Sequence, residues 1–411
     1  MSDSQVKKGG LKRNAIWMVF GNSIYAACQW VVLISIARLK GPEAVGDFTL
    51  ALAVTAPIIM FFNCGIRTII ATDHTSTFDV KTLLYIKLAL SIFSFAVCIG
   101  ASFIFRAEVR DIIWIVAASK VIESFSDFCY GYAQKSGELN SISLSLFVRG
   151  VISTLTIVIF LFLDLTMQIT LLAYTVTWFA VLVFYDVRNV EHFDVNGVVR
   201  SEKVMRFLRS GIPLGITTLF SLLGPNIPRY VLEKYYGPLD LGLYSSMAYF
   251  VALGNIFIMS IGQALIPILS RQHAAKRHRE FFTLTLSILA VVIVAGGICT
   301  LIAYAYGGQL IRLLYGERFA GKADVFPVIV VAAIIGYVGN VLGVAVTSAK
   351  IFAGQAPAFG LAALIGLVAA LVYVPQYGVL GAAYSLVVAS AMSVLAPLVL
   401  LFIYRRNFRG R

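Results

Sequence analysis

Gly41-Pro42-Glu43-Ala44-Val45-Gly46 and Gly237-Pro238-Leu239-Asp240-Leu241-Gly242 are the two stretches that decide the fold. Both read G-P-x-x-x-G, and each follows one long apolar segment and opens the next. The copies begin at residues 41 and 237 of 411, so about half of the chain separates them. A duplicated set of membrane helices is typical of transporters, because alternating access needs two similar halves that move against each other.

The composition excludes a soluble protein of this length. The chain is 59% hydrophobic and 13% charged, its mean hydropathy is +0.88, and no soluble core could hide that much apolar surface. Apolar segments long enough to cross a bilayer recur along the chain, and short loops between them favour helices over a barrel. We predict an all-α integral membrane protein with about twelve transmembrane helices, at residues 14–37, 47–70, 83–105, 112–132, 142–163, 169–185, 207–232, 243–269, 282–304, 325–348, 358–374 and 379–404.

A polar interruption between the sixth and seventh segments divides these helices into two sets. It predicts a cytoplasmic linker at 187–205 between an N-terminal six-helix lobe at 1–186 and a C-terminal six-helix lobe at 206–411. Six spans is an even number, so both lobes enter the membrane from the same side. The two lobes are therefore expected to be parallel, pseudo-symmetric repeats.

The net charge of +13 reflects membrane topology and does not indicate nucleic-acid binding. Most of the 33 lysines and arginines fall in loops on one side of the predicted membrane. By the positive-inside rule that side is the cytoplasm, and both termini lie there. The basic cluster at 271–279 is expected to contact anionic lipid headgroups.

The fourth predicted span carries Lys120, Glu123 and Asp127 on one helical face, because they are three and four residues apart. Charges at this depth are costly, so the stripe must face protein or water. Two interpretations are open. Either Lys120 and Glu123 form an internal ion pair that fixes helix packing, or the stripe is a polar cavity wall where Glu123 or Asp127 binds a coupling cation.

Four further cations fall inside or at the ends of spans. Arg67 and Lys87 either extend toward the cytoplasmic interface or take part in a binding site. Arg149 and Arg229 lie deeper, and a guanidinium matches the oxygens of a phosphate or pyrophosphate. We therefore predict that Arg149, Arg229, Arg67 and Lys120 contact an anionic substrate.

Amide side chains within the spans suit either sugar hydroxyls or contacts between helices; the candidates are Asn22, Asn226 and Asn255. Asn226 stands between Pro225 and Pro228 in the seventh span. Two prolines remove two backbone donors and are expected to break the helix. The break is either a packed kink or a hinge beside a transport cavity that Asn226 and Arg229 face.

Motifs of catalysis are missing from the sequence. It contains no phosphate-binding loop of the form G-x-x-x-x-G-K-[ST], no Cys/His cluster with metal spacing and no nucleophile–base motif. We predict a membrane transporter with no tightly bound cofactor and no metal, driven by a sodium or proton gradient.

Five stretches together resemble Wzx-type oligosaccharide flippases over nearly the whole chain. They are ARLKGPEAVG at 37–46, KVIESFSD at 120–127 with Tyr130-Gly131 and Gln134-Lys135 after it, Arg149-Gly150, LYGERF at 314–319 and YGVLGAA at 377–383. The resemblance implies a MATE-like, two-lobed fold of the multidrug/oligosaccharidyl-lipid/polysaccharide (MOP) exporter superfamily. It also implies a basic central cavity that accepts pyrophosphate and glycan, a role that Arg149 and Arg229 would fit.

The function that follows is translocation of a polyprenyl-pyrophosphate-linked oligosaccharide repeat unit from the inner to the outer leaflet, for O-antigen, capsule or exopolysaccharide synthesis. We expect the lobes to rock around a cavity lined by the first, second, seventh and eighth spans. The expected location is the cytoplasmic membrane of a bacterium or archaeon, with a polysaccharide polymerase and assembly proteins as possible partners besides the membrane lipids. The alternatives are a cation-coupled multidrug antiporter of the same superfamily and a membrane scaffold that transports nothing.

Overall fold

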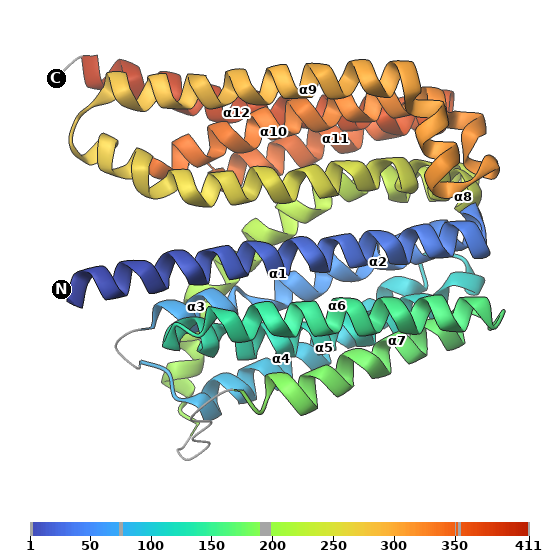
Figure 1. Cartoon of the computed structure of the whole chain (residues 1–411), viewed down its shortest axis with the longest axis horizontal. Helices are drawn as coiled ribbons and strands as arrows, with labels where there is room; N and C mark the ends of the chain where they lie inside the picture. The colour runs from blue at the N-terminus through green and yellow to red at the C-terminus, as the bar shows by residue number, and fades with distance from the viewer. Residues whose placement is uncertain (1–2, 74–76, 190–198, 350, 352–354, 410–411) are drawn as a thin grey trace. The chain divides into compact units, whose positions relative to one another are not determined.

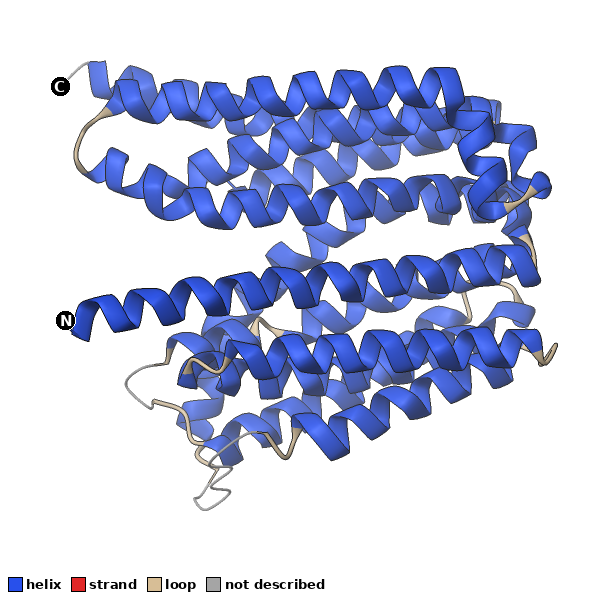
Figure 2. Ribbon diagram, viewed as in Figure 1, coloured by secondary structure: helices blue, strands red, loops and turns tan. Residues whose placement is uncertain are grey.

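The computed structural model describes residues 3–73, 77–189, 199–349, 351 and 355–409, and these residues form helices joined by short loops. Figure 2 shows the helices, and Figure 1 gives their order along the chain. Their bounds are α1 Asp3–Leu39, α2 Pro42–Asn63, α3 Ile66–Thr72, α4 Val80–Ser102, α5 Ala107–Ser136, α6 Leu139–Phe162, α7 Met167–Val181, the π-helix η1 Leu182–Asp186, α8 Ser201–Ala274, α9 His278–Tyr315, the 3-10 helix η2 Glu317–Val325, α10 Phe326–Ser348, α11 Gln355–Tyr377 and α12 Val379–Arg409. The predicted all-α membrane fold is confirmed.

Ten stretches of the described residues are long and apolar enough to cross a membrane. The count is below the predicted twelve for two physical reasons. Helix α5 carries Lys120, Glu123 and Asp127 near its middle, which lowers its hydropathy. Helix α8 joins two of the predicted spans end to end, across Gly237.

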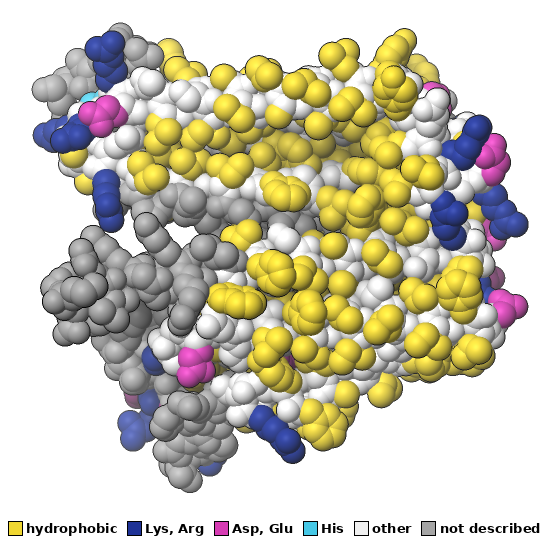
Figure 3. Space-filling model, in the orientation of Figure 1, with side chains coloured by type: hydrophobic (Ala, Val, Ile, Leu, Met, Phe, Trp, Pro, Cys, Tyr) yellow, Lys and Arg dark blue, Asp and Glu magenta, His cyan; other side chains and the backbone are white. Residues whose placement is uncertain are grey.

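The surface of the described residues fits a bilayer. Large apolar side chains such as Ile92, Ile104, Phe162 and Tyr304 are more than 70% exposed. On the visible face, hydrophobic side chains cover the flanks of the helices, while lysine, arginine and acidic side chains gather toward the helix ends (Figure 3). A soluble protein does not leave such surface in water, so these flanks contact lipid.

The chain forms two compact units, and the division falls inside α8. Residues 1–40 and 47–219 make up the first unit, and residues 41–46 and 220–411 make up the second. The predicted linker at 187–205 lies earlier than this division, and its residues 190–198 lie outside the described part of the chain. Residues 201–219, predicted partly as linker and partly as the start of the second lobe, pack with the first unit.

In the first unit, the buried side of α5 is covered by its neighbours. Helices α3, α4 and α7 pack against α5, and α6 packs between α1 and α7. Small residues allow close approach: a Cβ added at Gly21 of α1 would lie 2.8 Å from the Cα of Ser143 on α6. In the second unit, α10 and α11 both pack on α12, and α9 packs on α10.

The two G-P-x-x-x-G copies contact each other within the second unit. A Cβ added at Gly46 would lie 2.0 Å from the carbonyl oxygen of Pro238, and one added at Gly242 would lie 1.8 Å from the carbonyl oxygen of Pro42. The contacts are reciprocal: the last glycine of each copy meets the proline of the other. Only glycine permits so close a backbone approach, which explains why both copies end in it.

Helix α8 continues through Pro225 and Pro228, so the prediction of a broken helix there is wrong. The backbone leaves helical geometry at Gly237, with φ 79° and ψ −169°. Proline inside a membrane helix can be accommodated where neighbouring groups satisfy the freed carbonyls. Glycine reaches a positive φ without steric cost, so the break falls where the second repeat begins.

Asp79 fixes the start of α4 and holds α8 beside it. Its carboxylate accepts hydrogen bonds from the backbone N–H of Thr82, at 2.9 Å, and from Nζ of Lys203 on α8, at 2.5 Å. Burial opposes ionisation of this group, but the hydrogen bonds from Lys203 and Thr82 outweigh burial and lower the pKa of Asp79. The first part of α8 is thereby joined to the first unit by an N-cap that is also an ion pair.

Candidate functional site

The stripe on α5 is a set of ion pairs. Nζ of Lys120 lies 2.6 Å from Oε2 of Glu123, and the Tyr25 hydroxyl of α1 donates to Oε1 of Glu123 at 3.4 Å. Nζ of Lys120 also lies 5.6 Å from the ring centroid of Trp178 on α7. The structure therefore contains the internal ion pair that was one of the two interpretations of this stripe.

Asp127, the other predicted coupling residue, pairs with a predicted substrate ligand. Nη1 of Arg67 on α3 lies 3.3 Å from Oδ1 of Asp127, and its Nε donates to Gln134 at 3.4 Å. The guanidinium carbon of Arg67 lies 5.4 Å from the ring centroid of Tyr130. Both acidic side chains of the stripe thus have a cationic partner in this structure, and a coupling cation would have to compete with that partner.

Arg149 of α6 is buried in an ion pair as well. Its side chain is 1% exposed, and Nη2 lies 2.7 Å from Oδ2 of Asp186, which is fully buried. Nη2 also donates to Ser126, and the Ser145 hydroxyl donates to the second carboxylate oxygen of Asp186 at 2.5 Å. Because Ser145 gives its proton to Asp186, the Tyr130 hydroxyl, 2.7 Å away, donates to Ser145.

Asp186 was not among the residues predicted from the sequence. It ends the π-helix η1, and the extra residue in this turn changes the direction of the side chains that follow α7. From the sequence, Asp186 is the first polar residue after an apolar span and looks like the start of a loop. The only available signal was the need of a buried arginine for a carboxylate, and it does not say which carboxylate.

Lys87 does not extend to the interface, so that interpretation is wrong. It is 3% exposed, and Nζ donates to Oδ1 of Asn63 at 2.7 Å and to Oγ of Ser124 at 2.8 Å. Asn22, a predicted sugar ligand, is exposed and donates to the carbonyl of Met18 in its own helix at 2.8 Å.

A cavity of about 420 Å³ opens inside the second unit. Its described lining comes from α8, which holds the predicted seventh and eighth spans, and from α10, α11 and α12. Because this cavity lies within one unit, the predicted cavity between the lobes, lined also by the first and second spans, stays a prediction. Arg229 is the one charged residue in that described lining; the polar residues around it are Ser221, Asn226, Tyr244, Asn255, Tyr337, Asn340, Ser390 and Ser393. The predicted residues Asn226, Arg229 and Asn255 are thus brought together at one cavity.

The guanidinium of Arg229 has few partners of its own. Nη1 donates to Oδ1 of Asn226 at 2.8 Å, while Nε is buried and has no hydrogen-bond partner. No carboxylate forms an ion pair with Arg229 among the described residues. A half-buried cation without a counter-ion carries a desolvation cost that an anionic ligand would offset.

The amides beside Arg229 are held by the protein itself. Asn340 donates to Oδ1 of Asn255 at 2.8 Å, and Asn226 donates to the carbonyl of Leu222 at 2.8 Å. The Tyr337 hydroxyl donates to the carbonyl of Val251 at 2.7 Å. Fixed amides present defined donors and acceptors to a ligand, as sugar and phosphate recognition require.

Solved structures of membrane transporters share this fold. An inward-facing MATE family multidrug resistance transporter of the MOP superfamily matches with a TM-score of 0.77 and 13% identity, over 96% of this chain and 95% of that chain. The lipid II flippase MurJ in an inward closed conformation matches with a TM-score of 0.75 and 14% identity, over 95% of this chain and 87% of that chain. The chain thus has the fold of these MOP-class transporters, and its membrane spans make it a multi-pass membrane protein.

The family is shown by sequence. A family model described as polysaccharide biosynthesis protein matches residues 11–273, which is more than half of the chain, so the chain belongs to that family. The capsular polysaccharide biosynthesis protein CapF of Staphylococcus aureus is 26% identical over 411 residues, covering 96% of this chain and all of the relative. The resemblance to Wzx-type flippases is confirmed, and the chain is a membrane protein of a polysaccharide biosynthesis family with a transporter fold.

Proposed function

We propose that this protein moves a polyprenyl-pyrophosphate-linked oligosaccharide from the inner to the outer leaflet by alternating access. Membership of the polysaccharide biosynthesis family supports a substrate of this class. Moving such a lipid requires a polar path for its head while its tail remains in the bilayer. The two units divided at residues 219 and 220 are the bodies that would move.

The observation that carries this proposal is the environment of Arg229. It is the single charged side chain in the described lining of the cavity, and its Nε has no partner. A cavity built for cationic drugs would need acidic side chains, whereas a guanidinium flanked by amides suits a pyrophosphate and the first sugar. Arg229, Asn226 and Asn255 are therefore the substrate residues of the proposal.

The size of the cavity fits a head group better than a whole glycan. A volume of about 420 Å³ lies at the lower end of the range for small-ligand pockets. The pyrophosphate and one adjoining sugar would occupy it, and the remaining sugars would extend beyond it. Arg149, Arg67 and Lys120 are already paired with acids, and in this proposal they support the first unit and do not contact substrate.

The family and the charge pattern support a proposal for the location, topology and partners of the protein. We infer a cytoplasmic membrane of a bacterium or archaeon, with both termini in the cytoplasm and a polymerase acting on the product outside. An ion gradient, of sodium or protons, supplies the energy. Glu123 and Asp127 remain candidates for the coupling site only if their cationic partners move away during the cycle.

Translocation in proteoliposomes tests the role of Arg229. A labelled polyprenyl-pyrophosphate oligosaccharide is supplied, and its exposure in the opposite leaflet is read with an external sugar-modifying enzyme. Arg229→Ala should lower the rate at least about tenfold, because it removes a charge-assisted bond of roughly 1.5–3 kcal/mol, and Arg229→Lys should retain part of the rate. The matched control is Arg209→Ala, which removes an exposed cation from the same helix. Transport by Arg229→Ala at the rate of the control would contradict the anion site.

A further inference from the structure

Lys87 is a buried cation whose hydrogen-bond partners are both neutral. Nζ donates to Oδ1 of Asn63, at 2.7 Å, and to Oγ of Ser124, at 2.8 Å. Ser124 in turn donates its own proton to the carbonyl of Val121 at 2.7 Å, so its oxygen can only accept from Lys87. Nζ also lies 5.3 Å from the ring centroid of Phe125. By contrast, three other cations on or beside α5, Arg67, Lys120 and Arg149, each have a carboxylate partner.

The titratable groups facing Lys87 leave it without a counter-ion of its own. Helix α5 contributes Asp127, which is already paired with Arg67, and the thiol of Cys129. The residue after α2 contributes the thiol of Cys64. On α8, Lys203 is paired with Asp79, and Arg206 and Arg209 are exposed. A lysine in such a site can exchange its proton more readily than an arginine could, because an amine is neutralised far more easily than a guanidinium.

The partner of Lys87 stands at a break in a membrane helix. Asn63 is the last residue of α2, and the two residues after it both have left-handed backbones, with φ 49° at Cys64 and 61° at Gly65. Helix α3 begins at Ile66. The ammonium group therefore lies at the carboxyl-terminal end of α2, where the helix dipole and unpaired carbonyls favour a positive charge. Discontinuous membrane helices are places where transporters bind coupling ions.

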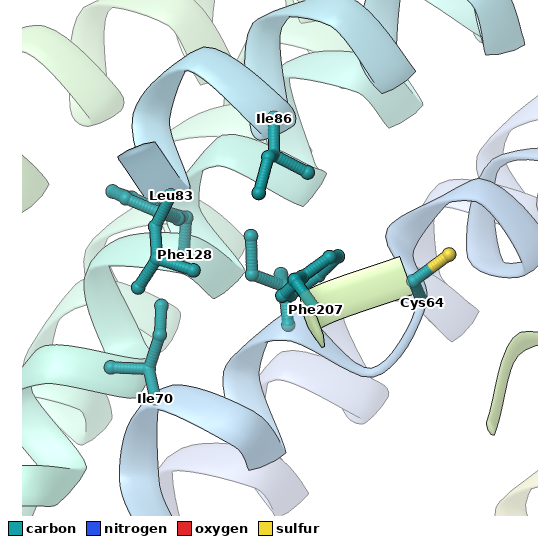
Figure 4. Packing of buried hydrophobic residues seen from close by; sticks show 7 residues of the cluster. Cys64, Ile70, Leu83, Ile86, Phe128 and Phe207 are labelled. Atoms are coloured by element: carbon teal, nitrogen blue, oxygen red, sulfur yellow. The ribbon is translucent and has the colours of Figure 1, made fainter. Parts of the chain in front are cut away.

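Helix α8 packs directly on this break. A Cβ added at Gly211 would lie 2.8 Å from the Cβ of Cys64, and one added at Gly215 would lie 2.4 Å from the carbonyl oxygen of Phe61. Figure 4 shows Phe207 of α8 beside Cys64, in a cluster with Ile70, Leu83, Ile86 and Phe128. The same helix leaves the first unit after Leu219 and reaches Arg229 in the second. A conformational change at the α2–α3 break would thus act directly on α8, the helix that carries Arg229.

We propose that Lys87 is the site that binds and releases the coupling proton, and that the α2–α3 break transmits its charge state to α8. The step is the loss of one proton from the ammonium to give a neutral amine and a hydrated proton. The amine keeps enough N–H groups to bind Asn63 and Ser124, but its attraction to the α2 dipole and to Asp127 is lost. The break then loosens, and α8 is free to shift. This inference rests on the proposed function only in taking transport to be gradient-driven.

Hydrogen exchange tests the proposal without any substrate. In the full chain in lipid nanodiscs, amide exchange of segments 61–70 and 207–216 is measured across pH and corrected for its intrinsic pH dependence. In the wild type the corrected exchange rate of these segments should rise by about tenfold from acid to alkaline pH. That change corresponds to a decrease of about 1.4 kcal/mol in the free energy of local opening. Lys87→Arg is charged at every pH, so its exchange rate should stay at the low value that the wild type has at acid pH. Lys87→Met is never charged, so its exchange rate should stay at the high value that the wild type has at alkaline pH.

The control is Lys81→Met, which removes an exposed lysine from the same helix and should respond to pH as the wild type does. A pH response retained in Lys87→Arg would overturn the proposal, even if Lys87→Met does not fold. In proteoliposomes, Lys87→Met should lose the stimulation by a pH gradient but keep downhill exchange. Absence of transport by the wild type would count against the proposed function, while the exchange result would still decide the role of Lys87.

Discussion

At the scale of single residues, five cations within the membrane-spanning helices fall into two groups. Arg149, Arg67 and Lys120 have carboxylate partners within 3.3 Å, and together they order the helices around α5. Lys87 and Arg229 have neutral hydrogen-bond partners only. Paired charges in a low-dielectric interior can specify packing, whereas an intramembrane charge without a counter-ion is a candidate for binding a ligand or a proton.

The Arg149–Asp186 pair is predicted to be structural. Arg149→Leu should lower the free energy of unfolding by about 3–5 kcal/mol, because it leaves the Asp186 carboxylate buried and uncompensated. The double variant Arg149→Leu with Asp186→Leu should recover most of that loss. Unfolding in a denaturing detergent titration measures both values.

An exposed ion pair provides the control for this prediction. Arg312→Leu removes one partner of the Arg312–Glu317 pair, whose side chains are 61% and 74% exposed, and should cost less than about 1 kcal/mol. If Arg149→Leu cost no more than Arg312→Leu, the buried pair would not have the structural role assigned to it.

The residues differed in how well the sequence predicted them. Lys120 and Glu123 are three residues apart on one helix, and helical geometry alone brings them together. Asp186 reaches Arg149 only because a π-turn redirects it, and no spacing rule foresees that turn. Lys87 was placed near a span end by counting residues, but tertiary packing of α2 and α5 buries it.

At the scale of elements, the duplicated motif is a structural contact as well as a repeat. The sequence showed that the two G-P-x-x-x-G copies are alike, and the structure shows that the last glycine of each copy packs on the proline carbonyl of the other. Repetition can be read from one sequence, whereas mutual packing of the copies depends on the tertiary fold. The prolines of α8 suggested a break at 225–228, whereas the backbone leaves helical geometry only at Gly237.

Adding one carbon at this contact is predicted to be destabilising. Gly46→Ala or Gly242→Ala places a Cβ about 2 Å from a carbonyl oxygen, and the backbone shift that this forces should cost roughly 1–3 kcal/mol or more. The measurement is thermal stability in detergent together with the yield of folded protein. Gly100→Ala in α4, which meets nothing within 4 Å, is the control and should be neutral or slightly stabilising. Equal stability of all three variants would rule out the close backbone contact.

At the scale of the whole molecule, function depends on what connects the two units. The chain passes between them at residues 40–41, 46–47 and 219–220, and the last of these passages lies within the continuous helix α8. A helix that begins against the α2–α3 break and continues to Arg229 can couple events in the first unit to ligand binding in the second. The chain belongs to a polysaccharide biosynthesis family and shares the fold of MOP-class transporters, and in the proposed function the cavity around Arg229 supplies the preference for an anion.

Leaflet-to-leaflet translocation by the purified wild-type protein tests the proposed function. Proteoliposomes are loaded with a labelled polyprenyl-pyrophosphate oligosaccharide, and its exposure to an external sugar-modifying enzyme is followed with and without an imposed ion gradient. A flippase driven by an ion gradient should give exposure well above that of empty liposomes, and the gradient should accelerate it. Exposure equal to that of empty liposomes, with folded protein and several glycans tried, would contradict it.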